Sequence, residues 1–287
     1  MHKVTTAKSN IKITLGLCVK ALVEPEYTVR LNDWASEDIV RKYRYFQKLQ
    51  KPEEIVLNEL RAKLPKMRML DIGVGAGRTT YYFAPLTKEY VGVDISKNMI
   101  GACRRKFRNY PKKISFEVAD ARDLNLFGDN YFDFSLFSFN GIDMMNHDDR
   151  LRTLREIRRV TKNGGYVCFS AHNLNYAWNF ATFKLSRKPA DLLLEAQRLF
   201  LMRLFNRKVW KILRTKNQRK QRYLIFNDGV WNFSLKLYYI KPEEQIDQLT
   251  NLNFKNIRSY DLLGNEIKNP SELQNATDCW IYYLCNV

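Results

Sequence analysis

The chain has 287 residues, of which 45% are hydrophobic, so it is long enough for one large α/β domain, or for one domain with a lid. Its net charge is +18, no apolar run reaches the roughly 18 residues that a transmembrane helix needs, and the five cysteines form no C-x-x-C pair. With only three histidines, a metal cluster is not expected either. We therefore expect reduced thiols, no metal and a cytoplasmic location.

The first part of the chain is predicted to be helical. The apolar spacing after Asn32 and Asp33 predicts an amphipathic helix, and Pro52 followed by two glutamates opens a second helix that runs to about residue 62. We assign residues 1–64 to an N-terminal helical cap.

Three glycines at alternate positions form the most informative stretch of the chain. Residues 68–72 are predicted to be a short buried strand, Gly73, Gly75 and Gly77 carry the turn after it, and a helix resumes at about residue 78. Glycine permits a positive φ and lets a ligand approach the backbone closely. The amides that open the helix then face that ligand.

This turn differs from the two common phosphate-binding motifs. A phosphate loop requires Gly-Lys-Ser/Thr, and the turn contains no lysine. The dinucleotide fingerprint requires a third glycine where Arg78 stands. Asp71, beside the turn, would repel phosphate but can receive an ammonium group, so we expect a ligand with a zwitterionic amino-acid end.

The next two predicted strands also end in aspartates. Residues 89–93 lead to Asp94, residues 114–118 lead to Asp120, and Ser96 can cap the helix between them. A carboxylate after the second strand can hold both ribose hydroxyls. One after the third strand can accept a hydrogen bond from an adenine amino group, so the three acids predict amine, ribose and adenine contacts in order.

The fourth and fifth predicted strands are followed by residues that are candidates for contacting a second ligand, the substrate. Residues 131–138 precede Asn140 and Asp143, and residues 166–170 precede His172, so these side chains are expected at the carboxyl edge of the sheet, where ligands bind. Asn140 can donate and accept hydrogen bonds, whereas Asp143 either pairs with a substrate amine or caps a turn. Imidazole titrates near neutral pH and suits proton abstraction, so His172 is the candidate base, with a structural histidine as the alternative.

Residues 174–223 form a strongly basic insertion, with 13 Lys and Arg residues against 2 acids, a net charge of +11. Residues 189–213 within it are predicted to be helical, with a broad apolar side. We interpret the insertion as a lid with a solvated basic face. A membrane-surface helix and an RNA-binding patch are the alternatives.

The last part of the chain is predicted to complete the sheet. Strands at 222–226 and 230–240 flank Asn227-Asp228-Gly229, which predicts a tight hairpin turn. Trp231 lies on the second of these strands and is a candidate pocket residue. A helix at 242–250 and strands at 254–260 and 279–285 follow.

The stretch Met69-Leu70-Asp71-Ile72-Gly73-Val74-Gly75-Ala76-Gly77-Arg78, together with Asp94, Asp120 and strand 131–138, resembles the class I S-adenosylmethionine-dependent methyltransferases. The resemblance runs from about Lys66 to Asn173 and resumes more weakly from Tyr239. It implies an α/β fold with a Rossmann-like, mostly parallel seven-stranded sheet, an antiparallel last strand, and a helical and β-hairpin lid. The implied domains are the cap (1–64), a cofactor-binding core (65–173), the basic lid insertion (174–238) and a C-terminal completion of the sheet (239–287).

The resemblance also implies which residues hold S-adenosylmethionine and an acceptor. The expected cofactor-binding residues are Asp71, Gly73, Gly75, Gly77, Arg78, Asp94, Ile95, Met99, Asp120, Ala121 and Phe139. Helices before the first strand cover the active site in this family, so the expected acceptor-binding residues are Trp34, Tyr43, Asn140, His172 and Trp231. Core packing is the alternative for Trp34 and Tyr43.

These expectations favour methyl transfer from S-adenosylmethionine to an O or N atom of a small, secondary-metabolite-like acceptor, without a metal. A sulfonium methyl is already activated, so proximity, alignment and a dry pocket can account for much of the rate. Two alternatives stay open: an RNA-modifying methyltransferase that uses the basic insertion, and a non-catalytic adaptor at anionic lipid surfaces.

Overall fold

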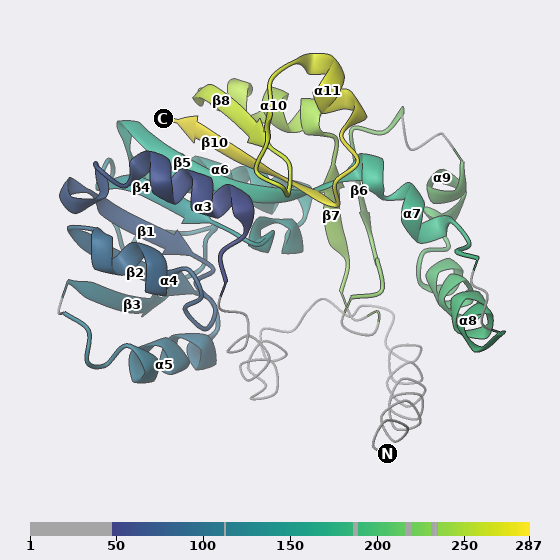
Figure 1. Cartoon of the computed structure of the whole chain (residues 1–287), viewed down its shortest axis with the longest axis horizontal. Helices are drawn as coiled ribbons and strands as arrows, with labels where there is room; N and C mark the ends of the chain where they lie inside the picture. The colour runs from purple at the N-terminus through teal and green to yellow at the C-terminus, as the bar shows by residue number, and fades with distance from the viewer. Residues whose placement is uncertain (1–47, 112, 186–188, 216–219, 231–232, 234) are drawn as a thin grey trace.

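The computed structural model describes residues 48–111, 113–185, 189–215, 220–230, 233 and 235–287 (Figure 1). Its strands are β1 (Arg68–Ile72), β2 (Glu89–Asp94), β3 (Ile114–Val118), β4 (Phe132–Phe137), β5 (Thr161–Asn173), β6 (Tyr223–Phe226), β7 (Leu237–Ile240), β8 (Lys255–Tyr260), β9 (Glu266–Ile267) and β10 (Trp280–Asn286). Its α-helices are α3 (Lys51–Leu60), α4 (Thr80–Phe83), α5 (Lys97–Lys106), α6 (His147–Val160), α7 (Trp178–Ala181), α8 (Pro189–Phe205), α9 (Trp210–Arg214), α10 (Pro242–Asn251) and α11 (Pro270–Asn275). Short 3₁₀ helices are η2 (Leu64–Lys66), η3 (Ala84–Leu86), η4 (Gly141–Met144) and η5 (Leu174–Tyr176).

The strands form one mixed sheet in the order β3-β2-β1-β4-β5-β10-β8-β9. The pairs from β3 to β5 are parallel, and β10 is antiparallel to both β5 and β8. The predicted α/β class, with a mostly parallel sheet and an antiparallel last strand, is therefore confirmed. Among the described residues the sheet has ten strands instead of the predicted seven: the two-residue β9 extends one edge, and β6 and β7 join at β5.

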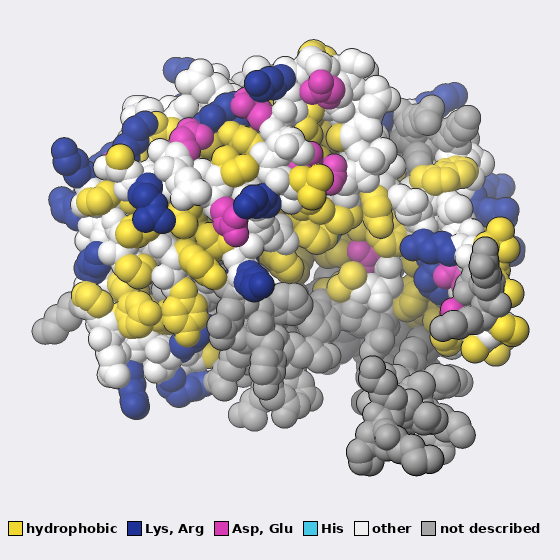
Figure 2. All heavy atoms as spheres, in the orientation of Figure 1, with side chains coloured by type: hydrophobic (Ala, Val, Ile, Leu, Met, Phe, Trp, Pro, Cys, Tyr) yellow, Lys and Arg dark blue, Asp and Glu magenta, His cyan; other side chains and the backbone are white. Residues whose placement is uncertain are grey.

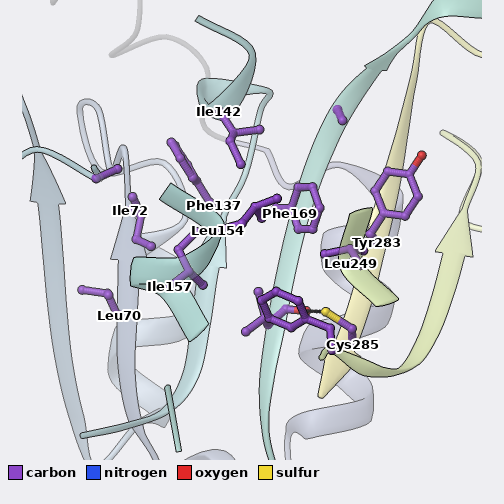
Figure 3. Packing of buried hydrophobic residues seen from close by; sticks show 14 of the residues in the cluster. Leu70, Ile72, Phe137, Ile142, Leu154, Ile157, Phe169, Leu249, Tyr283 and Cys285 are labelled. Carbon is purple, nitrogen blue, oxygen red and sulfur yellow. Dashed lines mark hydrogen bonds between the residues drawn. The ribbon is translucent and has the colours of Figure 1, made fainter. Parts of the chain in front are cut away.

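Alternate side chains of each strand pack into two cores on opposite faces of the sheet. Met69 of β1 belongs to a core that includes α3, α4 and α5, whereas its neighbour Leu70 belongs to a core that includes α6 and α10. Figure 3 shows the second core, where Leu154 and Ile157 of α6 meet the sheet residues. Because helices cover both faces, the ligand-binding edge is left at the carboxyl ends of the parallel strands.

The insertion builds a third, smaller core beside the sheet. Its members are Leu174, Ala177, Met202, Leu213, Leu224, Phe226, Leu237 and Tyr239. The helix predicted over 189–213 is broken into α8 and α9, because Asn206 turns its side chain to the backbone of Asn227 and leaves the helical path. In Figure 1, α7, α8 and α9 lie together on one side of the molecule, away from β1, β2 and β3.

The predicted tight hairpin turn at Asn227-Asp228-Gly229 is wrong. β6 and β7 do pair antiparallel, but their last pair is Phe226 with Leu237, so the three residues Asn227-Asp228-Gly229 do not by themselves close the hairpin. Asn227 and Asp228 instead accept hydrogen bonds from the backbone amides two residues ahead of each, which makes local Asx turns. β7 then pairs in parallel with the end of β5, placing Tyr239 opposite His172.

Two further boundaries differ from the sequence expectation. The helix after the glycine turn is limited to Thr80–Phe83, because a 3₁₀ turn containing Pro85 follows at once. β5 is longer than predicted, starting at Thr161 and bulging before Tyr166, and it continues to Asn173. That extension carries His172 on a strand rather than on a loop.

Within the described ranges, no helix is long and apolar enough to cross a bilayer. Four described cysteines, Cys103, Cys168, Cys279 and Cys285, are free thiols. In the same part of the chain, no group of three or more His, Cys, Asp or Glu side chains is arranged to hold a metal ion.

Candidate active site

The turn after β1 has the backbone form that its glycines predict. Gly73, Gly75 and Gly77 have φ values of 63°, 54° and 77°, in the left-handed region. A Cβ on Gly77 would lie 2.4 Å from the ring of Phe107, so space as well as φ requires glycine there. The Gly75 amide donates to Asp94 Oδ2 (2.9 Å), which fixes the turn against the end of β2.

Asp71 is buried at the end of β1, with 1% of its surface exposed. Its Oδ2 accepts hydrogen bonds from the hydroxyls of Thr79 and Tyr90. Burial raises the pKa of Asp71 to about 6, although these two hydrogen bonds and the charge of Arg78 act in the opposite direction. The carboxyl group therefore titrates just below neutral pH.

A small cavity of about 40 Å³ lies at this turn. It is lined by Asp71, Gly73, Val74, Gly75, Ala76, Arg78, Thr79, Ser138 and Phe139. Ligand pockets for whole small molecules usually measure at least ~300 Å³, so this cavity fits only one polar end of a ligand. Its lining offers a carboxylate and backbone amides to that end, and this donor set fits an amino-acid group.

Arg78 lines the cavity, but its guanidinium is paired. Nη1 and Nη2 lie 2.5 and 2.6 Å from the two carboxylate oxygens of Glu53, a fully buried residue of α3. Tyr282 and Ser138 also donate to Glu53. The sequence prediction placed Arg78 correctly beside the turn but missed Glu53, because acids at Pro52-Glu53-Glu54 are equally typical of a helix N-terminus.

Asp94 lies at the carboxyl end of β2, as predicted. Its Oδ1 accepts from the Ser96 amide (2.8 Å) and its Oδ2 from the Gly75 amide. Burial raises its pKa from the usual value. Each carboxylate oxygen can accept more than one hydrogen bond, so a ribose hydroxyl can still be bound. Ile95 is 37% exposed beside it, whereas Met99 is buried at 2%.

Asp120 follows β3 and is ion-paired. Arg122 lies 2.6 Å from its carboxylate and also contacts Asp149. Burial disfavours ionisation of Asp120, but the hydrogen bonds and charge of Arg122 outweigh it and lower the pKa. Ala121, next to it, is 8% exposed. The adenine contact of this pair of residues stays a prediction.

Asn140 and His172 meet at the carboxyl edge of β4 and β5. Asn140 has a left-handed backbone (φ 60°), donates its amide to Ser170 Oγ (2.9 Å), and is 5% exposed. Its Nδ2 lies 3.4 Å from His172 Nε2. Among the described residues, its buried Oδ1 has no hydrogen-bond partner, which marks the pair as a place where a polar ligand atom fits.

Asp143 holds the other side of the His172 ring. Its Oδ2 accepts from the His172 backbone amide (2.6 Å) and lies 2.8 Å from Nδ1. This arrangement assigns the Nδ1–H tautomer and leaves the Nε2 lone pair on the Asn140 side. The sequence analysis weighed Asp143 only as an amine partner or a cap, because nothing in the sequence shows that it reaches across to β5.

The Asp143 carboxylate is itself shared. Arg150 of α6, fully buried, forms an ion pair with it and also contacts Gln245 of α10. The Arg150 guanidinium lies 4.8 Å from the ring centroid of Tyr238. Two donors on one buried carboxylate fix its position, so the imidazole of His172 is held rigidly.

Aromatic rings join the glycine turn to His172. The Trp280 ring lies 6.0 Å from that of Phe139, which lines the cavity, and 6.1 Å from that of His172. The Tyr239 ring lies 4.8 Å from the other side of the imidazole. Trp280 and Tyr239 were not in the predicted acceptor set. The predicted Trp34, Tyr43 and Trp231 lie outside the described residues.

Comparisons with known proteins match parts of the chain to methyltransferases. Residues 69–165 match the family model described as a methyltransferase domain. The chain is 30% identical over 151 residues to a demethylmenaquinone methyltransferase from Staphylococcus saprophyticus, covering 52% of this chain and 62% of that protein. It is 31% identical over 143 residues to one from Renibacterium salmoninarum, covering 50% of this chain and 52% of that protein. The chain thus spans roughly half to three fifths of the length of these relatives.

Two solved structures share the fold at low identity. An S-adenosylmethionine-dependent methyltransferase from Mesorhizobium loti superimposes with a TM-score of 0.55 at 15% identity, covering 82% of this chain and 98% of that one. Another from Clostridium acetobutylicum gives a TM-score of 0.55 at 14% identity, covering 83% and 91%.

Proposed function

Because the chain belongs to the class I S-adenosylmethionine-dependent methyltransferases, we propose that it transfers a methyl group from S-adenosylmethionine to an O or N atom of a small-molecule acceptor. The bound cofactor supplies a methyl group already activated by its sulfonium. In this proposal Asp71 holds the ammonium of the amino-acid end, Asp94 holds the ribose hydroxyls and Asp120 accepts from the adenine amino group.

The observation that supports binding and deprotonation of the acceptor at this place is the contact between Asp143 and His172, beside the Asn140 Oδ1 that has no hydrogen-bond partner among the described residues. Asp143 orients the imidazole through Nδ1 (2.8 Å), so Nε2, which Asn140 Nδ2 approaches only to 3.4 Å, is the nitrogen that takes a proton from an acceptor hydroxyl or ammonium. Asn140 Oδ1, which no described residue contacts, then positions the acceptor through a hydrogen bond. The rings of Tyr239 and Trp280 lie 4.8 and 6.1 Å from the imidazole and make its surroundings largely apolar.

The names of the relatives suggest where acceptor screening starts. Two of them are named demethylmenaquinone methyltransferases, so quinone-like aromatic compounds open the panel. Planar phenols and aromatic amines of the same size complete the first panel, because the described walls of this site are aromatic.

The experiment compares His172→Ala with the wild type in transfer of labelled methyl to an acceptor found in that panel. Loss of a positioned general base lowers kcat by roughly 10²–10⁴-fold. Asp143→Asn is expected to lower kcat less, because it loosens the ring but keeps the base, and to lower the unfolding free energy, because the buried Arg150 loses its counter-ion. Both variants are expected to keep wild-type affinity for S-adenosylhomocysteine, since neither residue contacts the glycine turn.

His147→Ala is the matched control. This histidine begins α6 and stacks on Tyr223 with 4.4 Å between ring centroids, in a cavity separate from the glycine turn. It should leave kcat within about twofold of the wild type. Wild-type turnover in His172→Ala would refute the role of the dyad and leave proximity alone as the source of catalysis.

A further inference from the structure

Helix α8 has apolar side chains on two sides, and the described structure covers one of them. Met202 points into the small core of the insertion and is fully buried. On the opposite side, Leu193 and Phe200 are 74% and 65% exposed. Leu193, Ala196 and Phe200 follow the i, i+3, i+7 spacing of one helix face.

The same face becomes basic toward the end of the helix. Arg203 continues the spacing beyond Phe200 and is exposed, and Arg207, in the turn just after the helix, is exposed as well. Lys208, Lys211 and Arg214 of the adjoining turn and α9 are exposed as well. Residues 189–215 contain six basic and two acidic side chains, a net charge of +4, and one of the acids, Glu195, is paired with Arg198 (2.7 Å).

Figure 2 shows this composition on the surface. Hydrophobic side chains gather at the position of α8 in Figure 1, and Lys and Arg side chains lie beside them. A monomeric protein rarely leaves several large aliphatic and aromatic side chains together on one exposed helix face, unless a partner covers them.

We infer that the α8 face, defined by Leu193, Ala196, Phe200 and Arg203 together with Arg207 just after the helix, docks on the surface of an anionic lipid bilayer. Apolar side chains on an interfacial helix enter the boundary between headgroups and acyl chains, while arginines at its end reach the phosphates. The charge complementarity with anionic lipid selects this partner. An RNA would use the arginines but would leave Leu193 and Phe200 in contact with phosphate and water.

This inference does not depend on methyl transfer. The α8 face lies in the insertion, and none of its five residues lines the cavity at the glycine turn or contacts His172.

The test is flotation of the full chain with phosphatidylcholine vesicles that contain about one third phosphatidylserine, beside vesicles of phosphatidylcholine alone. The wild type is expected to bind the anionic vesicles at least about tenfold more tightly than the neutral ones. The double variant Leu193→Gln/Phe200→Gln and the double variant Arg203→Glu/Arg207→Glu are each expected to lose at least about tenfold in binding to anionic vesicles.

Two matched controls change the same chemistry elsewhere. Leu263→Gln removes a leucine that is 76% exposed in the loop after β8, and Arg61→Glu with Lys66→Glu reverses two exposed charges near α3. Both should bind anionic vesicles like the wild type. Unchanged affinity for S-adenosylhomocysteine in every variant verifies that each is folded.

Three results would overturn the inference. One is absence of wild-type binding to anionic vesicles, which means that another part of the chain covers the face. A second is binding lost with the arginines but kept in Leu193→Gln/Phe200→Gln, which indicates a purely electrostatic partner such as RNA. The third is a dimer in sedimentation that Leu193→Gln/Phe200→Gln converts to a monomer, which assigns the face to a second copy of the chain.

Discussion

The titration of Asp71 gives a prediction that links stability to ligand binding. Its pKa is raised to about 6 from the usual 3.8, because the carboxylate is buried. A ligand ammonium binds the ionised form only. The ionised fraction rises from about one tenth at pH 5 to about nine tenths at pH 7, so the affinity for S-adenosylhomocysteine should rise about tenfold over that interval.

Replacing Asp71 by Asn keeps the shape and removes the titration. The variant should bind S-adenosylhomocysteine more weakly than the wild type does even at pH 5, which is a loss of more than about tenfold relative to the wild type at pH 7, and its affinity should be constant between pH 5 and pH 7. Calorimetric titration at pH 5, 6 and 7 measures both effects. Asp129→Asn is the control, because that side chain is 68% exposed and far from the turn in sequence.

The same substitution should stabilise the protein at neutral pH. A raised carboxyl pKa means that protonation favours the folded state; this contribution is complete below about pH 3.8 and is lost as the pH rises through about 6. The difference corresponds to about 3 kcal/mol. Asp71→Asn should therefore gain up to about 3 kcal/mol in unfolding free energy relative to the wild type at pH 7, measured by urea denaturation. Constant wild-type affinity from pH 5 to 7, or wild-type affinity in Asp71→Asn, would refute the reasoning.

Two further substitutions test other parts of the site. Glu53→Gln removes the carboxylate that pairs with Arg78. The largely buried guanidinium then lacks its partner, so the unfolding free energy measured by urea denaturation should fall by roughly 3–5 kcal/mol. A loss below ~1 kcal/mol would show that this ion pair does not stabilise the fold. Gly77→Ala and Gly164→Ala have nearly equal φ values, 77° and 76°, but only the first places a Cβ against a ring, that of Phe107, whereas nothing lies within 4 Å of the second. The second should lose roughly 1–2 kcal/mol from backbone strain alone, and the first a further 1–3 kcal/mol from overpacking; equal losses would show that space is not limiting at the turn.

The core of the fold could be predicted because its signals are local. Short apolar runs that end in Asp71, Asp94 and Asp120 define parallel strands, and the strands appear within one or two residues of the predicted bounds. The glycine turn was predictable for the same reason, since a positive φ at Gly73, Gly75 and Gly77 leaves few other residues to choose.

Features that depend on distant contacts could not be predicted from the sequence. Asp143 reaches His172, 29 positions away, and Glu53 reaches Arg78, 25 positions away, and neither separation follows a helix or strand repeat. The turn at Asn227 failed for a related reason. Its backbone amide and carbonyl bond to the Asn206 side chain of the insertion, and its own side chain bonds to the following loop, so tertiary contacts override the local preference for a tight hairpin.

In the proposed function, the glycine turn and Asp94 hold S-adenosylmethionine. Calorimetric titration of S-adenosylhomocysteine into the purified chain tests this binding, with NAD as the control ligand and Asp94→Ala as the control variant. We expect micromolar binding of S-adenosylhomocysteine, no binding of NAD, and a loss of affinity in Asp94→Ala, because both ribose hydroxyls lose their acceptor. If S-adenosylhomocysteine does not bind, or binds Asp94→Ala as tightly as the wild type, the proposed cofactor site is wrong.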